Sequence, residues 1–351
     1  MKKISVYLTF DYELPLGGIA KSYKHSLFDP TDRLFDIARK LEVPITLFAD
    51  ILSYQKFKEH DIPEFYKHFE RQISYALKHK HDVQLHIHPH WIDTRFVQNQ
   101  FVPDPKFALG DFANKTYPND IEGIIETSYN TLKNMCAQTD EKHPIIAYRA
   151  GGYNLFPNTE RILQALYKNG IQVDSSISRG YYFKSDFSLI DYRKVPNKPN
   201  WFLDFKGDFT KESQQGIYEI PIASKPKSLF EVPTKFKLKK MQHRAVANRG
   251  KMMHVNENVG FVDKVKQALS SRMLTVDNHT YSPDYLMDIL HYNIRKFKEF
   301  DVVNLSLIAH PKSMGDYAFY LLEEFVTRAR EKYQNKIEFT TFKANTPFLP
   351  L

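Results

Sequence analysis

The sequence has a single cysteine, Cys136, among 351 residues. One cysteine excludes an internal disulfide and a zinc site built from cysteine side chains. Cys136 ends a segment, residues 121–136, whose apolar residues follow helical spacing. We therefore expect Cys136 to be a thiol buried in the core of the protein.

The sequence also lacks a long apolar run. No stretch approaches the roughly 18–20 residues that a membrane-spanning helix needs. The short apolar run near the N-terminus is followed by acidic residues and by no small-residue cleavage site, so we interpret it as a first β-strand. These absences predict a cytoplasmic protein, with a peripheral membrane location as the alternative.

Two common catalytic motifs are missing as well. There is no G-x-S-x-G motif of a serine hydrolase and no phosphate-binding loop of the Walker type. The chemistry must therefore be sought in other residues.

Positive charge is concentrated in one segment. The net charge is +8, and residues 225–251 contain nine Lys or Arg residues against one acidic residue, which by itself amounts to +8. This segment is either a solvated insertion or a patch that meets an anionic polymer, a lipid-linked substrate or a membrane surface. No nucleic-acid-binding motif accompanies it, so we expect no nucleic-acid partner.

Short apolar runs rich in β-branched residues alternate with amphipathic segments along the chain. This alternation predicts a parallel α/β sheet, open or closed into a barrel. We expect one domain over residues 1–351, with excursions at about 181–216 and 225–280. The expected strands cover residues 4–10, 44–49, 83–88, 145–148, 171–174, 217–222 and 302–309. The expected helices include residues 29–42, 62–80, 121–136, 157–170 and 282–300.

Ionisable or polar residues stand where five of these seven strands end. In parallel α/β folds the carboxyl ends of the strands share one rim, which is where active sites form. Buried charges are costly unless they are paired or bound to metal, so this collection predicts an active site. The residues are Asp11, Glu13, His86, His88, His90, Arg149, Asp174, Ser175, Ser176 and His310.

A divalent metal accounts for the cluster. Imidazole nitrogens and a carboxylate suit zinc, with cobalt, nickel or manganese as alternatives. A bound metal makes water a usable nucleophile, a nearby carboxylate can accept its proton, and a histidine can protonate the leaving group. Strand alternation by itself would place His86 and His88 on one face, as an H-x-H metal pair.

Several segments together resemble the polysaccharide deacetylase family, also described as the NodB homology group and as carbohydrate esterase family 4. The resemblance extends in the expected order from about residue 5 to residue 312. The motifs that carry it are "TFDYE", "DVQLHIHPH", "YRAGGYNLF", "YKNGIQVDSSIS" and "LIAHPKS". It implies a distorted seven-stranded (β/α) barrel and the metal-dependent removal of an acetyl group from an N-acetylated sugar.

The resemblance also implies roles for individual residues. Asp11 would be the catalytic base, Arg149 would orient it, and His310 would be the general acid. Glu13, His86 and His90 would bind the metal, because the metal histidines of the family stand four residues apart. His88 then has no fixed role.

The sequence departs from the family pattern at two motifs. Tyr12 separates two acids that are usually adjacent, and glycines replace the usual prolines after Arg149.

The substrate would meet residues around this centre. We expect Trp91 and Tyr153 to stack on a sugar ring or to pack at the rim. Leu307 and Ile308 would wall the acetyl pocket, and Asp174 would support the acid histidine or the loop above it.

The expected substrate is a carbohydrate of a cell-surface glycan or its precursor, anionic or lipid-linked. Two other functions remain open. One is another C–N metallohydrolase, such as an amidase on the same fold. The other is a glycan-binding relative without activity.

Overall fold

The structure is a computed structural model that describes residues 3–16, 18–19, 21–97, 100–227, 259–277, 280–346 and 349–350. The basic segment at 225–251 lies outside the described residues from position 228 onward.

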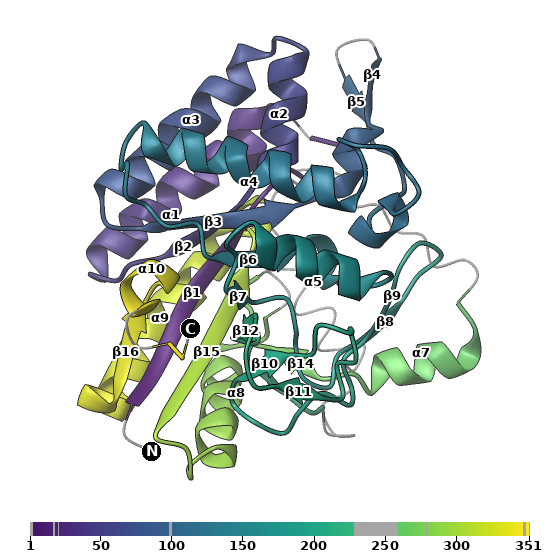
Figure 1. Cartoon of the computed structure of the whole chain (residues 1–351). Helices are drawn as coiled ribbons and strands as arrows, with labels where there is room; N and C mark the ends of the chain where they lie inside the picture. The colour runs from purple at the N-terminus through teal and green to yellow at the C-terminus, as the bar shows by residue number, and fades with distance from the viewer. Residues whose placement is uncertain are drawn as a thin grey trace.

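A ring of parallel strands forms the centre of the molecule (Figure 1). In spatial order, β1 pairs with β2, β2 with β3, β3 with β6, β6 with β7 and β7 with β12, while β15 pairs with the other edge of β1. The bounds of these strands are β1 (Lys3–Tyr12), β2 (Thr46–Asp50), β3 (Asp82–Ile87), β6 (Ala147–Ala150), β7 (Val173–Asp174), β12 (Tyr218–Glu219) and β15 (Val302–Ala309). They fall on the seven predicted strands.

The ring closes just beyond β12. Ile222 forms parallel bridges with Ser178 on one side and with Ser306 of β15 on the other. The backbone N–H of Ala223 donates to the Ser306 carbonyl at 2.9 Å, and the Ser306 N–H donates to the Pro221 carbonyl at 3.2 Å. Because the contact consists of isolated bridges, the barrel is distorted at this seam. The α/β barrel expected from the sequence is confirmed.

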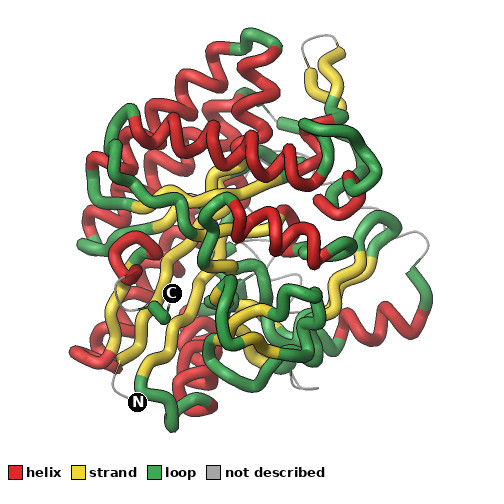
Figure 2. The backbone as a smooth tube through the Cα atoms, in the orientation of Figure 1, coloured by secondary structure: helices red, strands yellow, loops and turns green. Residues whose placement is uncertain are grey.

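Helices surround the strands (Figure 2). Their bounds are α1 (Asp29–Lys40), α2 (Ile51–Glu59), α3 (Pro63–Lys78), α4 (Ile121–Ala137), α5 (Thr159–Lys168), α7 (Phe261–Ala268), α8 (Pro283–Lys296), α9 (Asp316–Tyr333) and α10 (Phe342–Asn345). Cys136 is buried in α4, as expected. Within the described ranges, no helix combines the length and apolarity that crossing a membrane requires.

Side-chain caps and glycine set several helix ends. The Asp120 side chain accepts the Gly123 N–H at 2.9 Å and begins α4. The Ser282 side chain likewise caps α8. Gly170 follows α5 with φ of 92°, a conformation that favours glycine.

The remaining strands lie outside the ring or extend it. β4 pairs with β5, β8 with β9 and β13 with β14, while β10 and β11 extend the sheet beyond β12 and β16 pairs with β1. Their bounds are β4 (Arg95–Val97), β5 (Gln100–Val102), β8 (Tyr182–Lys184), β9 (Leu189–Asp191), β10 (Trp201–Leu203), β11 (Glu212–Ser213), β13 (Ser224–Lys225), β14 (Arg272–Met273) and β16 (Ile337–Thr340). The excursion expected at about 181–216 contains β8 to β11.

An aromatic plug fills the barrel at the end where β1 begins. Phe342 of α10 stacks on Tyr7 with ring centroids 4.7 Å apart and meets Phe48 edge-on at 5.5 Å. Val173 and Ile220 complete a core cluster that is separate from the one beneath the helices. Among the described residues, these side chains fill this end of the barrel, and the polar residues lie toward the opposite rim.

Replacing Phe342 with alanine tests the plug. The ring is fully buried, so its loss should lower the free energy of unfolding by about 3–5 kcal/mol. Urea denaturation of the two proteins measures the change. The control is Phe261→Ala, because Phe261 is 81% exposed and its loss should change the stability by no more than about 0.5 kcal/mol. Equal losses in the two variants would contradict the described plug.

Candidate active site

Two acids leave the end of β1 on the same side. Successive side chains of a strand alternate between faces, so residues 9, 11 and 13 share the inward face. The Asp11 and Glu13 side chains are both buried at the rim of the barrel. The intervening Tyr12 points outward, where its hydroxyl donates to Gln72 at 2.8 Å. The D-x-E spacing thus brings both carboxylates to one site, which adjacent acids on a regular strand would not do.

Arg149 of β6 is a buried cation whose five N–H groups all have acceptors. Its Nη1 donates to Thr9 Oγ1 and to Asp11 Oδ1, each at 2.8 Å. Its Nη2 donates to Ser175 Oγ at 3.0 Å and to Ser306 Oγ at 3.1 Å, while Nε donates to the Ser175 carbonyl at 2.8 Å. A guanidinium has only these five donors. Arg149 therefore holds Asp11 in place and keeps no donor for a substrate.

Glu13, His86 and His88 form a buried cluster. One potential ligand atom from each lies within 4.8 Å of those of the other two. Glu13 Oε2 is 3.3 Å from His86 Nε2 and also contacts His88 Nε2. Burial alone would raise the pKa of Glu13, but His88, Lys312 and the hydrogen bond to His86 hold it well below its usual range.

The backbone fixes the orientation of the His86 ring. Its Nδ1 lies 2.8 Å from the Arg149 carbonyl oxygen, which can only accept a hydrogen bond. Nδ1 must therefore carry a proton, and in the neutral ring Nε2 is the free base that faces Glu13. Although burial opposes charge on His86, the carboxylates of Asp11 and Glu13 raise its pKa to about 9.

His90 does not join this cluster. The strand ends at Ile87, and Pro89 begins a short 3₁₀ helix that carries His90 away from the strand face. The His90 ring lies against Trp91 and Phe107, with centroids 4.9 and 5.4 Å away. His88 therefore lies with His86 beside Glu13, since strand alternation continues through His88, while the His90 ring lies next to that of His88 with centroids 5.5 Å apart.

His310 lies on the other side of the two acids. Its Nε2 is 3.5 Å from Asp11 Oδ2 and 3.5 Å from Glu13 Oε1, and the Tyr153 hydroxyl is 3.3 Å away. Burial lowers the pKa of His310, although both carboxylates oppose this. The side chain keeps 23% exposure and reaches the open rim.

Sequence reasoning overlooked Lys312, which lies two residues after His310. Its ammonium donates to Glu13 Oε1 at 2.6 Å and to the Leu14 carbonyl at 3.1 Å. Lys312 thus occupies one carboxylate oxygen of Glu13 and leaves Oε2 directed at the two histidines. Its position in the "AHPKS" motif could have identified Lys312 as a candidate site residue.

Asp50 was also overlooked, although it ends the second strand. Its Oδ1 accepts the backbone N–H of His88 at 3.3 Å, and Oδ2 accepts the indole N–H of Trp91 at 2.8 Å. Asp50 thereby fixes the turn that carries His88. The position was predictable because an acid at a strand end belongs to the same rim.

The expected substrate contact by Trp91 is not supported. The ring is 2% exposed and packs against Phe57 and Phe101, with centroids 5.6 and 5.0 Å away. The bond to Asp50 draws the indole inward, so no face is open for a sugar.

Tyr153 remains at the rim. It is half-buried, with φ of 63°, and its carbonyl accepts the Tyr192 hydroxyl at 2.8 Å. Ile308 is buried on β15 beside Thr9. Leu307, one position before it, belongs to the core beneath the helices, because alternation turns it outward.

Asp174 supports the wall of the barrel. Its two oxygens accept the N–H and the hydroxyl of Ser176, each at 2.8 Å, and Ser176 Oγ in turn accepts the Ala150 N–H at 2.8 Å. Asp174 is fully buried, so it stabilises the turn after β6 and makes no rim contact. Burial and the neighbouring Asp174 together raise the pKa of Glu219 well above its usual range.

A pocket of about 480 Å³ opens beside Asn154. Its wall includes Asn154 and Phe156, together with Ser185, Phe187 and Leu189 from the turn and second strand of the β8–β9 hairpin. Mixed apolar and polar walls of this size suit a small organic group.

The residues present fit a divalent ion. Glu13 supplies oxygen, and His86 and His88 supply nitrogen, the donor set of zinc sites that leave a position open for water. His86 already has the outer hydrogen bond that metal-binding histidines usually make.

Several solved structures resemble this fold. A "putative polysaccharide deacetylase" from Mycobacterium smegmatis is 12% identical with a TM-score of 0.48, covering 99% of this chain and 90% of that one. Puue allantoinase is 12% identical with a TM-score of 0.47, covering 99% and 93%. A polysaccharide deacetylase from Bacillus cereus is 11% identical with a TM-score of 0.39, covering 97% and 92%.

At these values the likeness concerns the fold alone and carries no argument about activity. No protein-family model and no curated protein matches the sequence. The function is therefore argued from the site.

The Asp174–Glu219 pair gives a prediction about pH. Glu219 has a higher pKa in the folded protein than in the unfolded chain, so its protonated form stabilises the fold at low pH. That stability is lost as the pH rises from about 4.3 through the folded pKa, with a slope of at most about 1.4 kcal/mol per pH unit. Glu219→Gln should remove this slope, because an amide of the same size does not titrate. Urea titrations from pH 4 to pH 8 measure it.

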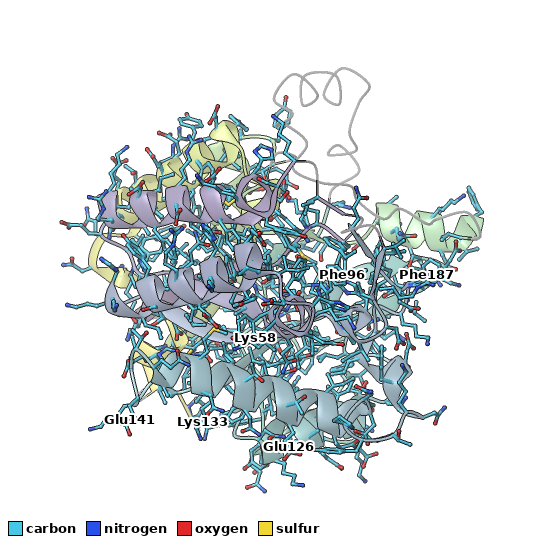
Figure 3. The ribbon with its side chains drawn as sticks, turned by 90° about the horizontal axis from the view of Figure 1, so that it is seen from above. Lys58, Phe96, Glu126, Lys133, Glu141 and Phe187 are labelled. Carbon is cyan, nitrogen blue, oxygen red and sulfur yellow. The ribbon has the colours of Figure 1, made fainter. Side chains whose placement is uncertain are left out.

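The matched control is Glu126→Gln on the exposed surface of α4 (Figure 3). It should keep the pH dependence of the wild type. If the Glu219→Gln curve instead runs parallel to the wild-type curve, the pKa of Glu219 is not raised by folding.

Proposed function

We propose that this protein is a metal-dependent hydrolase that removes an acetyl group from an N-acetylated sugar. The observation that carries the proposal is the buried Glu13–His86–His88 cluster with Asp11 and His310 beside it. The order of the motifs along the chain, which resembles that of polysaccharide deacetylases, supports the same reaction.

The ligand set in this proposal differs from the one that the resemblance implied. Glu13, His86 and His88 would hold the ion. Asp11 is less suited to do so, because Arg149 occupies its Oδ1. A bound zinc or similar ion would supply the means to activate water near neutral pH and to polarise the acetamide carbonyl.

Asp11 and His310 divide the proton transfers. Asp11 Oδ2 makes no bond to Arg149 and is the free oxygen that can accept a proton from the attacking water. His310 Nε2 would donate a proton to the departing amine. Because both groups share the rim with Glu13, acceptor and donor flank one reacting centre.

Arg149 and Tyr153 would position these groups. Arg149 has no donor left for substrate, so its part is to fix Asp11 and, through its carbonyl, His86. The Tyr153 hydroxyl would hold His310 at its ring nitrogen. A backbone N–H near Tyr153 would stabilise the oxyanion.

The substrate in this proposal is a cell-surface glycan or its precursor. The 480 Å³ pocket lined by Asn154 has room for a sugar ring. Sugar and acyl group are to be identified by assay.

Measurements of metal binding distinguish the role of His88 from that of His90. His88→Ala should weaken zinc binding by more than ~10–100-fold. Removing a ligand should cost more affinity than removing a residue that only hydrogen-bonds to a ligand, which costs about that much. His90→Ala should leave the affinity unchanged, since its ring lies outside the cluster. Titration of metal-free protein with zinc, followed by calorimetry and elemental analysis, gives both values. The reverse result would restore the His86–His90 pair.

Activity is tested by acetate release from a panel of N-acetylated sugars with zinc, cobalt, nickel or manganese. Asp11→Asn and His310→Ala should each lower kcat by about 10²–10⁴-fold while zinc stays bound. The control is His79→Ala, an exposed histidine at the end of α3.

Small cyclic amides belong in the same panel. Their hydrolysis without acetate release would replace the proposal by an amidase. Glycan binding by zinc-loaded protein without any turnover would indicate a relative that lacks activity.

A further inference from the structure

Helix α7 presents its apolar side to solvent. Phe261, Val262, Val265 and Leu269 are 81%, 64%, 41% and 58% exposed, and the helix has no buried residue. Phe261, Val265 and Leu269 are four residues apart, so they form one stripe along the helix. A surface helix of a globular protein normally turns such a stripe to the core.

The polar side of α7 anchors it to β8 instead. Asp263 Oδ1 accepts the Tyr182 hydroxyl at 2.6 Å, and Oδ2 accepts the Lys184 ammonium at 2.8 Å. Just after the helix, Ser270 Oγ accepts the Tyr182 N–H at 2.8 Å. The Lys266 ammonium lies 5.3 Å from the centre of the Tyr182 ring. These contacts fix the orientation of α7 and hold its apolar stripe facing outward.

The adjoining hairpin adds to the apolar surface. Phe187, in the turn between β8 and β9, is 38% exposed, and Leu189 at the start of β9 is 50% exposed. Figure 3 shows Phe187 on the same side of the molecule as α7. Exposed apolar side chains gathered on one face mark an interaction site more often than scattered ones do.

Charge indicates the kind of partner. α7 carries the exposed Lys264, and the chain immediately before it contributes a net +8 over residues 225–251, a property of the sequence alone. A second copy of the chain would carry the same positive charge, and the two would repel each other. An anionic bilayer attracts basic residues and accepts the apolar side of an interfacial helix.

We propose that α7 and the β8–β9 hairpin form a docking surface for an anionic lipid bilayer. Phe261, Val265 and Leu269 would enter the boundary between headgroups and acyl chains, while Asp263 stays on the protein side. The proposal is independent of the hydrolase activity, since it rests on exposure and charge. The hairpin also borders the 480 Å³ pocket, so docking would place that pocket near the lipid headgroups.

Co-sedimentation of the full chain with vesicles tests the proposal. One set contains phosphatidylcholine alone, and the other also contains about one third phosphatidylglycerol. The wild type should pellet with the anionic vesicles and less in high salt. The double variant Phe261→Ser, Leu269→Ser should lower the partition coefficient at least tenfold, with an unchanged circular dichroism spectrum.

A matched variant controls for the loss of exposed apolar surface. Val97→Ser, Val102→Ser removes side chains that are 50% and 41% exposed on the β4–β5 hairpin, and it should pellet as the wild type does. Three results would overturn the proposal. They are no binding to anionic vesicles, equal binding by the α7 variant, and a dimer in sedimentation velocity that the α7 variant abolishes.

Discussion

The site depends on the buried positive charge of Arg149, whose hydrogen-bond donors all have acceptors. Arg149 is a guanidinium with no exposure, and an unpaired cation at that depth would cost several kcal/mol. Acceptors from β1, from β15 and from the residues after β7 take up all five N–H groups. These acceptors come from separate strands, so the cation is satisfied only when the barrel is closed. Folding and the formation of the site are therefore linked through one residue.

The same residue links the two halves of the proposed chemistry. The Arg149 side chain holds Asp11, while its backbone carbonyl fixes the His86 ring. Glu13, just beyond the end of β1, then lies against His86 of β3 and against His88, which follows that strand. Among the described residues, the aromatic plug around Phe342 fills the other end of the barrel, and these groups lie toward the opposite rim. A buried interior that ends in charged groups suits polar catalysis, since electrostatic interactions are stronger away from bulk water.

Helix α7 shows the opposite use of amphipathicity. In the barrel helices the apolar side faces the sheet, whereas Asp263 binds α7 to the protein by its polar side. The 480 Å³ pocket and the proposed docking surface share the β8–β9 hairpin.

Much of the fold followed from short-range patterns. The seven strands were predictable because parallel strands buried on both faces are short continuous apolar runs. Helix α9 could have been predicted too, because Phe319, Leu322 and Val326 follow helical spacing. The closure of the barrel at Ile222 could not be predicted, since it consists of isolated bridges that have no recognisable sequence pattern.

Within the site, the sequence by itself determined which residues reach the rim. Alternation in β1 and β3 put Asp11 with Glu13 and His86 with His88, because a strand has a period of two residues. Only the tertiary structure decided between His88 and His90. The choice depends on where β3 ends and on the turn that Asp50 and Trp91 hold, and those contacts join segments about 40 residues apart. Lys312 likewise acquires its partner only when the end of β15 meets the end of β1, since a long-range ion pair has no local signature.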